Sequence, residues 1–232
     1  GALNPLFTQA DFDAERAKLI EGLKSDEKSA SAIAARVQNV LTYGKEHYNG
    51  EFTSEETLKN VTLQDVINHY NTYFVPSNAY LVVIGDVKTA NVKKKVEELF
   101  GADVWKKATA PNLTYNDPKD LQYSQINFVD VPNAVQSEIA LINLSKLKMN
   151  DKDYFAAILA NQILGGGGEG RLFLNLREKH GWTYGSYSNL GASKYISKFS
   201  STASVRNAVT DSAVVEIFNE LKRIRTDLVS AE

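Results

Sequence analysis

The sequence contains no cysteine among its 232 residues. A disulfide framework, a thiolate metal site and a cysteine nucleophile are therefore excluded. An excess of positive charge is also missing, because 26 Lys and Arg face 28 Asp and Glu for a formal net charge of −2. Binding to a phosphate backbone needs clustered Lys and Arg, so we expect no nucleic-acid partner.

Long apolar runs are absent as well. No run approaches the roughly 20 residues that span a bilayer, and residues 1–5 lack the basic flank and apolar stretch of a signal peptide. With 43% hydrophobic and 23% charged residues, the chain has the composition of a globular protein that buries a core. We expect it to be soluble and without a membrane span; its compartment stays open, with an extracytoplasmic one possible.

Motifs for metal or serine catalysis are lacking too. The histidines His47, His69 and His180 lie far apart in the sequence, and none belongs to H-E-x-x-H or H-x-x-E-H. Zinc sites draw several ligands in close, patterned spacing, so we expect this chain to bind no metal and no other cofactor. No G-x-S-x-G elbow for a nucleophilic serine occurs either.

The glycine run at residues 165–170 literally satisfies G-x-G-x-x-G. A dinucleotide site needs a strand leading into that motif and an acidic residue about 20 positions later. Here a predicted helix leads in, and no Asp or Glu occurs between Gly181 and Thr210. The run is better interpreted as a flexible connection between two helices.

Hydrophobic periodicity predicts helices over most of the first hundred residues. Two of them follow possible capping boxes, Thr53 with Glu56 and Thr62 with Asp65. The β-branched run 79–84 predicts a buried strand, and Thr89 is placed to cap the next helix. Residues 108–121 lack periodicity, so we expect one domain over 1–107, a linker over 108–121 and a second domain over 122–232.

The second half mixes both periodicities. Strands are predicted at 124–129 and 137–144, a strong helix at 151–164, a short helix at 171–180, and a last helix capped by Thr210. Residues 184–190 and 199–205 alternate at period two and predict a hairpin. Helices grouped against mainly antiparallel strands, without regular βαβ alternation, predict an α+β fold.

The segment from Leu172 to Gly185 combines an arginine and a tyrosine at the junction of a helix and a strand. Arg177 is expected near the helix end and Tyr184 at the start of the strand, separated by a turn at Gly181. A guanidinium and a phenol donate hydrogen bonds, which suits recognition of carbonyl oxygens. Alternatively, Arg177 caps helix carbonyls and Tyr184 packs in the core, since the helix dipole alone favours an Arg there.

Several motifs resemble the pitrilysin/insulinase-type zinc metallopeptidases. They are Ile163-Leu164-Gly165-Gly166-Gly167 leading to Arg171-Leu172-Phe173, Leu176-Arg177-Glu178-Lys179, Gly181-Trp182-Thr183-Tyr184, Pro76-Ser77-Asn78-Ala79, Gly85-Asp86-Val87, Pro132 with Val135-Gln136-Ser137, and Val61-Thr62-Leu63-Gln64-Asp65. The resemblance spans nearly the whole chain in the family's order. It implies parts of two tandem α+β domains, so that the chain is a fragment of a longer protein.

The resemblance also implies roles for individual residues. In the family, one half of a clamshell carries zinc on H-x-x-E-H, and the other half contributes an Arg and a Tyr seven residues apart, the separation of Arg177 and Tyr184. By that resemblance Arg177 binds a substrate carbonyl, Tyr184 supports the oxyanion, and Gly166 and Gly167 lie near the peptide. The implied partners are a peptide or unfolded polypeptide and a zinc-bearing catalytic half or subunit.

One departure from the family indicates which half this is. In catalytic halves a zinc-binding Glu follows a Glu-Arg pair, and matching that pair to Glu15-Arg16 puts Gly22 at the ligand position, with Glu21 one residue short. One helical residue turns a side chain by about 100°, so Glu21 is no simple substitute. We therefore expect a non-catalytic half; the alternatives are an inactive scaffold or assembly subunit and a free-standing peptide-binding module.

Overall fold

The chain is described by a computed structural model that covers residues 2–105 and 108–229. It divides into two compact units, each described by itself. The first unit combines residues 1–24 with 53–114, and the second combines 25–52 with 115–232. The division into two pitrilysin-like domains with a linker at 108–121 stays a prediction, and residues 108–121 form neither helix nor strand.

The first unit is helical. It holds most of α1 (Gln9–Asp26), with α3 (Glu55–Asn60), α4 (Leu63–Tyr73), the short 3-10 turn η1 (Pro76–Asn78) and α5 (Thr89–Phe100). The capping box of Thr62 and Asp65 at α4 is confirmed. At α3 the box is formed by Ser54 and Thr57, so the pairing of Thr53 with Glu56 was wrong by one residue. Thr89 is the first residue of α5 and not its cap.

The apolar contacts of the first unit are mainly aromatic. Phe7 meets the edge of Tyr70 at 5.4 Å between ring centroids, Tyr70 stacks on Phe74 at 4.8 Å, and Phe74 stacks on Trp105 at 5.2 Å. Among the described residues of this unit, Val75 is the only buried large apolar side chain. A core this thin leaves much apolar surface in contact with water.

The strand predicted at 79–84 is wrong for this structure. The segment has no strand partner within the described residues, and Tyr80 and Ile84 are 95% and 92% exposed. A strand exists only where a neighbour pairs with its N–H and C=O groups, and sequence alternation does not supply that neighbour. The segment therefore stays irregular although its residues favour β structure.

The second unit contains a three-stranded antiparallel sheet in the order β1-β3-β2. Its strands are β1 (Gln136–Ser145), β2 (Thr183–Leu190) and β3 (Ser197–Arg206). The strand at 137–144 and the hairpin of 184–190 with 199–205 are thus confirmed. The strand predicted at 124–129 is wrong for the same reason as 79–84: it pairs with no described segment, and Ile126 is 99% exposed.

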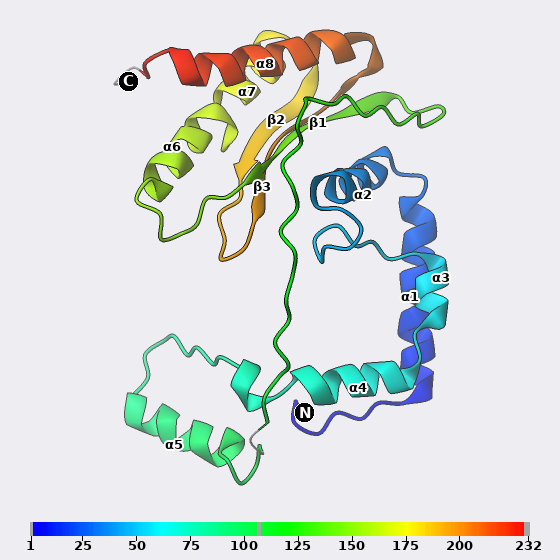
Figure 1. The fold of residues 1–232 in the computed structure, drawn as a ribbon, viewed down its shortest axis with the longest axis vertical. Helices are drawn as coiled ribbons and strands as arrows, with labels where there is room; N and C mark the ends of the chain where they lie inside the picture. Colours follow the sequence, from blue (N-terminus) through cyan, green and yellow to red (C-terminus); the bar gives the residue numbers. More distant parts are fainter. Residues whose placement is uncertain (1, 106–107, 230–232) are drawn as a thin grey trace. The chain divides into compact units, whose positions relative to one another are not determined.

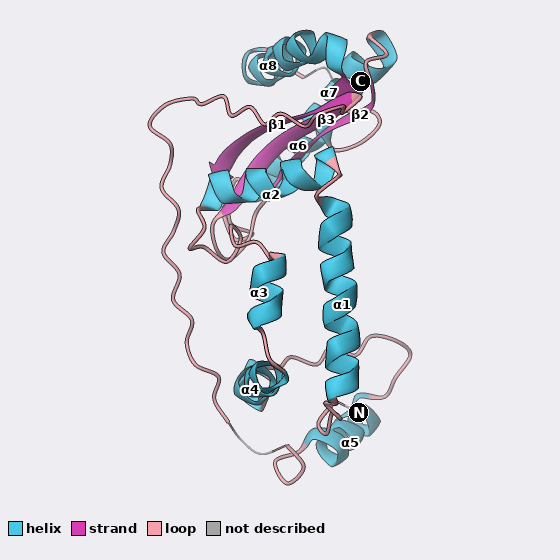
Figure 2. Cartoon of the chain, turned by 90° about the vertical axis from the view of Figure 1, so that its right-hand side faces the viewer, coloured by secondary structure: helices cyan, strands magenta, loops and turns pink. Residues whose placement is uncertain are grey.

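Helices cover both faces of this sheet (Figures 1 and 2). One face carries α6 (Tyr154–Gly165), α7 (Arg171–Phe173), the short π-helix η2 (Leu174–Lys179) and α8 (Thr210–Thr226), and α2 (Ala30–Tyr43) lies on the other. Ser29 caps α2, its side chain accepting a hydrogen bond from the Ala32 amide. Thr210 begins α8 but is not its cap, because its hydroxyl binds the Asn207 carbonyl and the Ser137 hydroxyl. The α+β class is confirmed.

The core of the second unit lies between the sheet and α6, α7 and α8. Eight buried residues form one cluster, with Leu172, Leu176, Val205, Ala213 and Ile217 fully covered. Burying side chains of this size contributes about 1.5–3 kcal/mol each relative to exposure, which anchors the helices on the strands. The segment from α7 through η2 to β2 is therefore held in a fixed position.

Candidate functional site

The helix that carries Arg177 ends in a wide turn. After the single turn α7, residues of η2 form a π-helix, in which the His180 amide donates to the Asn175 carbonyl at 3.2 Å, five residues back. Gly181 then reverses the chain with φ of 63°, a conformation that glycine adopts without a Cβ clash. Single π turns occur often at functional sites, and this one sets the direction in which Arg177 leaves the helix.

The Arg177 side chain is half exposed and lies over an aromatic ring. Its guanidinium carbon is 4.7 Å from the centroid of Phe173, one turn earlier, and its Nε is 3.5 Å from a carboxylate oxygen of Glu178. Among the described residues, no carbonyl accepts a hydrogen bond from this guanidinium. The structure does not use Arg177 as a helix cap; apart from Nε, which faces Glu178, its N–H groups have no partner among the described residues.

Tyr184 lies on a β-bulge. Thr183 pairs with Val205 and Ser186 pairs with Ala203, so Tyr184 and Gly185 together fill the space opposite a single residue of β3. The Thr183 hydroxyl closes the bulge, donating to the Gly185 carbonyl at 2.9 Å and accepting from the Gly185 amide at 3.1 Å. Bulges re-aim side chains, and Tyr184 is 88% exposed. The alternative that Tyr184 packs in the core is therefore wrong.

A second tyrosine links the helix to this bulge. Tyr187 lies 5.8 Å from Phe173 between ring centroids, and its ring covers Gly185, where a Cβ would come within 2.6 Å of it. We call Phe173, Arg177, Tyr184 and Tyr187 the Arg177 rim. Arg177 contacts Phe173, and Phe173 contacts Tyr187, which lies next to the bulge. Among the described residues, no hydrogen bond or cation–π contact joins Arg177 directly to Tyr184.

The glycine run adjoins the rim. An added Cβ at Gly165 would meet the Ser188 amide nitrogen at 2.6 Å, so this glycine is needed for close packing of α6 on β2. Gly166 ends α6 against Gln162, whereas Gly167 faces open space with only the Gln162 amide at 3.6 Å. A Cβ added at the next residue, Gly168, would lie 3.9 Å from the Phe173 ring. The loop thus passes beside the aromatic ring under Arg177.

An amide bridge holds η2 against α8. The Asn175 side-chain Nδ2 donates to Glu216 and to Glu220, each at 2.8 Å, and both Asn175 and Glu220 are buried. The hydrogen bond from Asn175 holds the pKa of Glu216 below its ordinary value. No sequence pattern indicates this contact, because the partners are 41 and 45 residues apart.

The histidines do not form a metal site. His47 packs between Tyr43 and Tyr48, His180 stacks on Trp182 at 4.1 Å, and His69 contacts Tyr73 on the surface of α4. Within the described ranges, no three His, Cys, Asp or Glu side chains are grouped so as to hold a metal ion. The residues present in this part of the chain therefore do not fit a zinc ion.

No helix in the described part of the chain combines the length and apolar character needed to cross a membrane.

The family model described as the peptidase M16 inactive domain matches residues 60–232, which is most of the chain. The chain belongs to this family. Its α+β fold and the motif resemblance to pitrilysin/insulinase-type peptidases are thereby confirmed, and the match to the inactive domain agrees with a non-catalytic half. The M16 match includes the whole Arg177 rim.

Two curated relatives come from Bacillus subtilis (strain 168). The probable inactive metalloprotease YmfF is 23% identical over 177 residues, covering 76% of this chain and 40% of that protein. The uncharacterized zinc protease YmxG is 24% identical over 186 residues, covering 78% of this chain and 43% of that protein. The chain therefore spans less than half the length of these relatives.

Solved structures show the same fold. The peptidase M16 inactive domain from Pseudomonas fluorescens matches with a TM-score of 0.83 at 19% identity, over 97% of this chain and 54% of that one. A protease from Helicobacter pylori matches with a TM-score of 0.83 at 20% identity, over 97% and 55%. The periplasmic protease PqqL from Escherichia coli matches with a TM-score of 0.68 at 18% identity, over 99% and 26%.

Proposed function

We propose that this chain belongs to the non-catalytic half of a zinc-dependent metallopeptidase and that the Arg177 rim binds and positions the peptide. The observation that carries the proposal is the exposure of two hydrogen-bond-donating side chains on packed supports: Arg177 over Phe173 and Tyr184 on a closed bulge. Side chains held by packing bind a ligand at a lower entropy cost than free ones.

Arg177 is suited to hold a peptide carbonyl. A guanidinium donates through a planar fork of N–H groups and accepts nothing, so it selects oxygen acceptors. The guanidinium carbon lies over the Phe173 ring at 4.7 Å from its centroid, while about half of the side chain stays accessible. In this proposal Arg177 fixes a carbonyl next to the bond that is cut.

Tyr184 is suited to donate a hydrogen bond to the carbonyl that reacts. Its hydroxyl has no partner within the described residues, and its backbone is fixed by the Thr183 hydroxyl at the bulge. A donor that is already in place stabilises negative charge as it develops on that oxygen. The glycines Gly166 and Gly167 would leave room for the peptide backbone beside the rim.

The metal chemistry belongs, in this proposal, to another domain or subunit. Zinc bound there would activate water, and the described residues of this chain include no group arranged to hold it. Two-part assembly is compatible with relatives that are about twice as long as the chain. Another structural relative, the ferredoxin protease FusC, was solved as a mutant in complex with Arabidopsis ferredoxin. By analogy, we propose that the ligand of the Arg177 rim is a polypeptide.

A second candidate is an inactive scaffold or assembly subunit. The name of YmfF, a probable inactive metalloprotease, favours it, as does the family's description as an inactive domain. The two candidates differ in whether Arg177 and Tyr184 touch a peptide. A scaffold tolerates their loss, whereas a positioning half does not.

Binding of a dye-labelled unfolded peptide to this chain, followed by fluorescence anisotropy, tests the proposal. Arg177→Ala is expected to weaken binding about three- to tenfold, the effect of one hydrogen bond to a half-exposed donor. Arg16→Ala is the matched control, because Arg16 also lies over a phenylalanine, Phe12, at 4.9 Å. Equal affinities for both variants and the unmodified chain would favour the scaffold.

A further inference from the structure

Asn175 is held by hydrogen bonds to both its backbone and its side chain. Its carbonyl accepts from the His180 amide at 3.2 Å, and this bond makes η2 a π turn. Its side-chain Nδ2 donates to Glu216 Oε2 and to Glu220 Oε1, each at 2.8 Å. One buried residue therefore forms the wide turn and also anchors it on α8.

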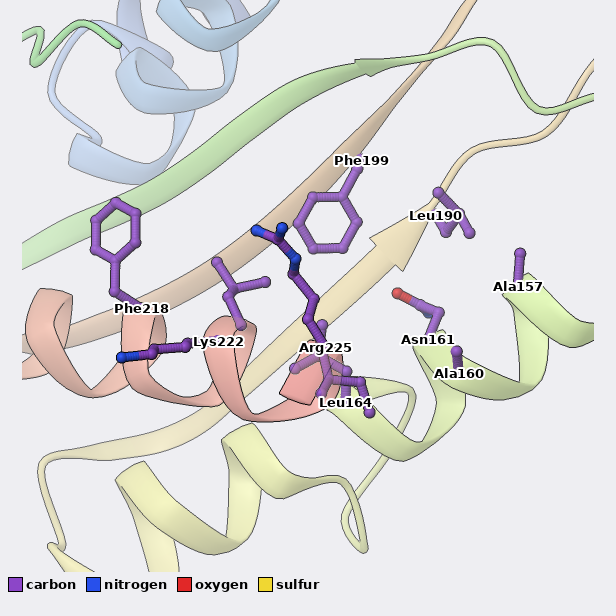
Figure 3. Close-up of a pocket in the computed structure, with 11 residues that line it drawn as sticks. Ala157, Ala160, Asn161, Leu164, Leu190, Phe199, Phe218, Lys222 and Arg225 are labelled. Carbon is purple, nitrogen blue, oxygen red and sulfur yellow. The ribbon is translucent and has the colours of Figure 1, made fainter. Parts of the chain in front are cut away.

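α8 uses one side for this contact and another for its contact with α6. Lys222 and Arg225 help to line a pocket of about 540 Å³ between α8 and α6 (Figure 3). Glu216 and Glu220 lie one helical turn apart and share a different side of α8, from which both carboxylates reach Asn175. The pocket side therefore offers a control substitution that leaves the contact with η2 intact.

The two carboxylates depend on the Asn175 amide. Glu220 is 6% exposed, and a buried carboxylate is costly unless its oxygens are hydrogen-bonded. Among the described residues its other partner is Arg223, with 3.6 Å between Arg223 Nη1 and Glu220 Oε2. An amide nitrogen carries two N–H groups and bonds both glutamates at once, whereas an ionised aspartate of the same shape only accepts.

Arg177 lies two residues after Asn175. Side chains two residues apart on a helix point to nearly opposite sides, so holding Asn175 against α8 turns Arg177 outward. There its guanidinium carbon lies 4.7 Å from the centroid of the Phe173 ring. A π turn holds more residues than an α turn. A change from one to the other would therefore rotate Arg177 about the helix axis relative to Phe173.

We propose that Asn175 is a positioning residue for peptide binding: its bonds to Glu216 and Glu220 keep the π turn that directs Arg177. This inference rests on the proposed function of the Arg177 rim. Without those bonds η2 relaxes toward a regular α turn, and the guanidinium moves away from the carbonyl that it holds.

A double-mutant cycle on peptide affinity tests the inference, by fluorescence anisotropy at neutral pH with this chain in its longer polypeptide. Asn175→Asp keeps the shape but loses the donors, and it should weaken binding about three- to tenfold, as Arg177→Ala does. Added to Arg177→Ala, it should weaken binding by less than about twofold, because the side chain that it positions is already gone. Lys222→Ala, on the pocket side of α8, should leave the affinity unchanged.

Two further variants separate positioning from a loss of folding. Asn175→Asp combined with Glu216→Gln and Glu220→Gln reverses both bonds, and it should restore peptide affinity to within about twofold, since each new amide donates to the new carboxylate. Glu216→Ala removes one bond at a partly exposed position and keeps the buried one. It should weaken binding about two- to fivefold, and its own cycle with Arg177→Ala decides if Asn175→Asp does not fold.

The outcomes separate this inference from the proposed function. An unchanged affinity in Arg177→Ala would end the proposed function and the positioning role together. A loss in Arg177→Ala without one in Asn175→Asp or Glu216→Ala would overturn the positioning role alone. Fully additive losses, or a reversed-bond variant that regains its melting temperature without its affinity, would equally overturn it, because Asn175 would then act on stability only.

Discussion

The guanidinium of Arg177 lies over the ring of Phe173, with 4.7 Å between the guanidinium carbon and the ring centroid. Phe173 is buried and its ring contacts Tyr187, while the ring supports the exposed cation. This contact couples the packing of the second unit to the direction of a side chain that faces solvent. Substitution of Phe173 should therefore change the affinity for a peptide, because it alters the position of Arg177.

Phe173→Leu keeps an apolar side chain in the core but removes the aromatic face. We expect peptide affinity to fall about two- to fivefold, because a cation–π contact at an exposed site contributes about 0.5–1 kcal/mol. The smaller side chain should also lower the free energy of unfolding by about 1–2 kcal/mol. Anisotropy and urea unfolding measure the two effects. Phe12→Leu, which removes the ring under Arg16, should leave peptide affinity unchanged.

Asn175→Asp places a carboxylate where an amide now donates to Glu216 and Glu220. Three carboxylates would then meet around a buried position, which raises the pKa of the introduced acid. Because its folded pKa would exceed its unfolded pKa, the variant should be destabilised at neutral pH. The loss should shrink as the pH falls through the folded pKa and the new acid becomes protonated.

In the unmodified chain, the contribution of Glu216 to stability has the opposite pH dependence. Its pKa is lowered in the folded state by the Asn175 hydrogen bond, so this stabilisation is present above the unfolded pKa and is lost as the pH falls through the folded one. Urea unfolding at pH 7 and at about pH 4 measures the difference between variant and unmodified chain. A difference that grows on acidification would rule out the amide bridge as described.

Gly165→Ala and Gly167→Ala form a matched pair. At Gly165 the new methyl group would meet the Ser188 amide and a Leu172 methyl at 2.6 and 2.7 Å, so we expect a loss of about 1–3 kcal/mol from overpacking. Gly167 has a negative φ and open space, so alanine there should be neutral or stabilising by up to about 1 kcal/mol. Thermal unfolding measures both, and equal effects would contradict the packing of α6 on β2.

The sequence predicted the second unit better than the first. Around β1, α6, the β2–β3 hairpin and α8, apolar residues recur with a clear period and share one core, so local pattern and tertiary packing agree. The segments 79–84 and 124–129 have equally strong β patterns, yet no described segment pairs with them. Pairing partners are a property of the whole chain, and an alternating pattern alone does not reveal them.

The candidate site was only partly predictable. Arg177 and Tyr184 came from a recognisable motif, and the structure agrees that neither is used as a cap or core residue. Phe173 was in principle detectable, since it lies four residues before Arg177, the spacing of neighbours on a helix. The π turn, the bulge at Tyr184 and the Asn175 bridge depend on backbone hydrogen bonds and distant contacts that leave no spacing in the sequence.

The most direct test of the account is the turnover number of the assembled peptidase, with this chain in its longer polypeptide and a zinc-bearing half present. Tyr184→Phe removes only the hydroxyl, and we expect kcat for peptide cleavage to fall about 10²–10³-fold while folding stays intact. Tyr123→Phe, at another exposed tyrosine of the second unit, should have no effect. An unchanged kcat for Tyr184→Phe would contradict the proposed role of the Arg177 rim.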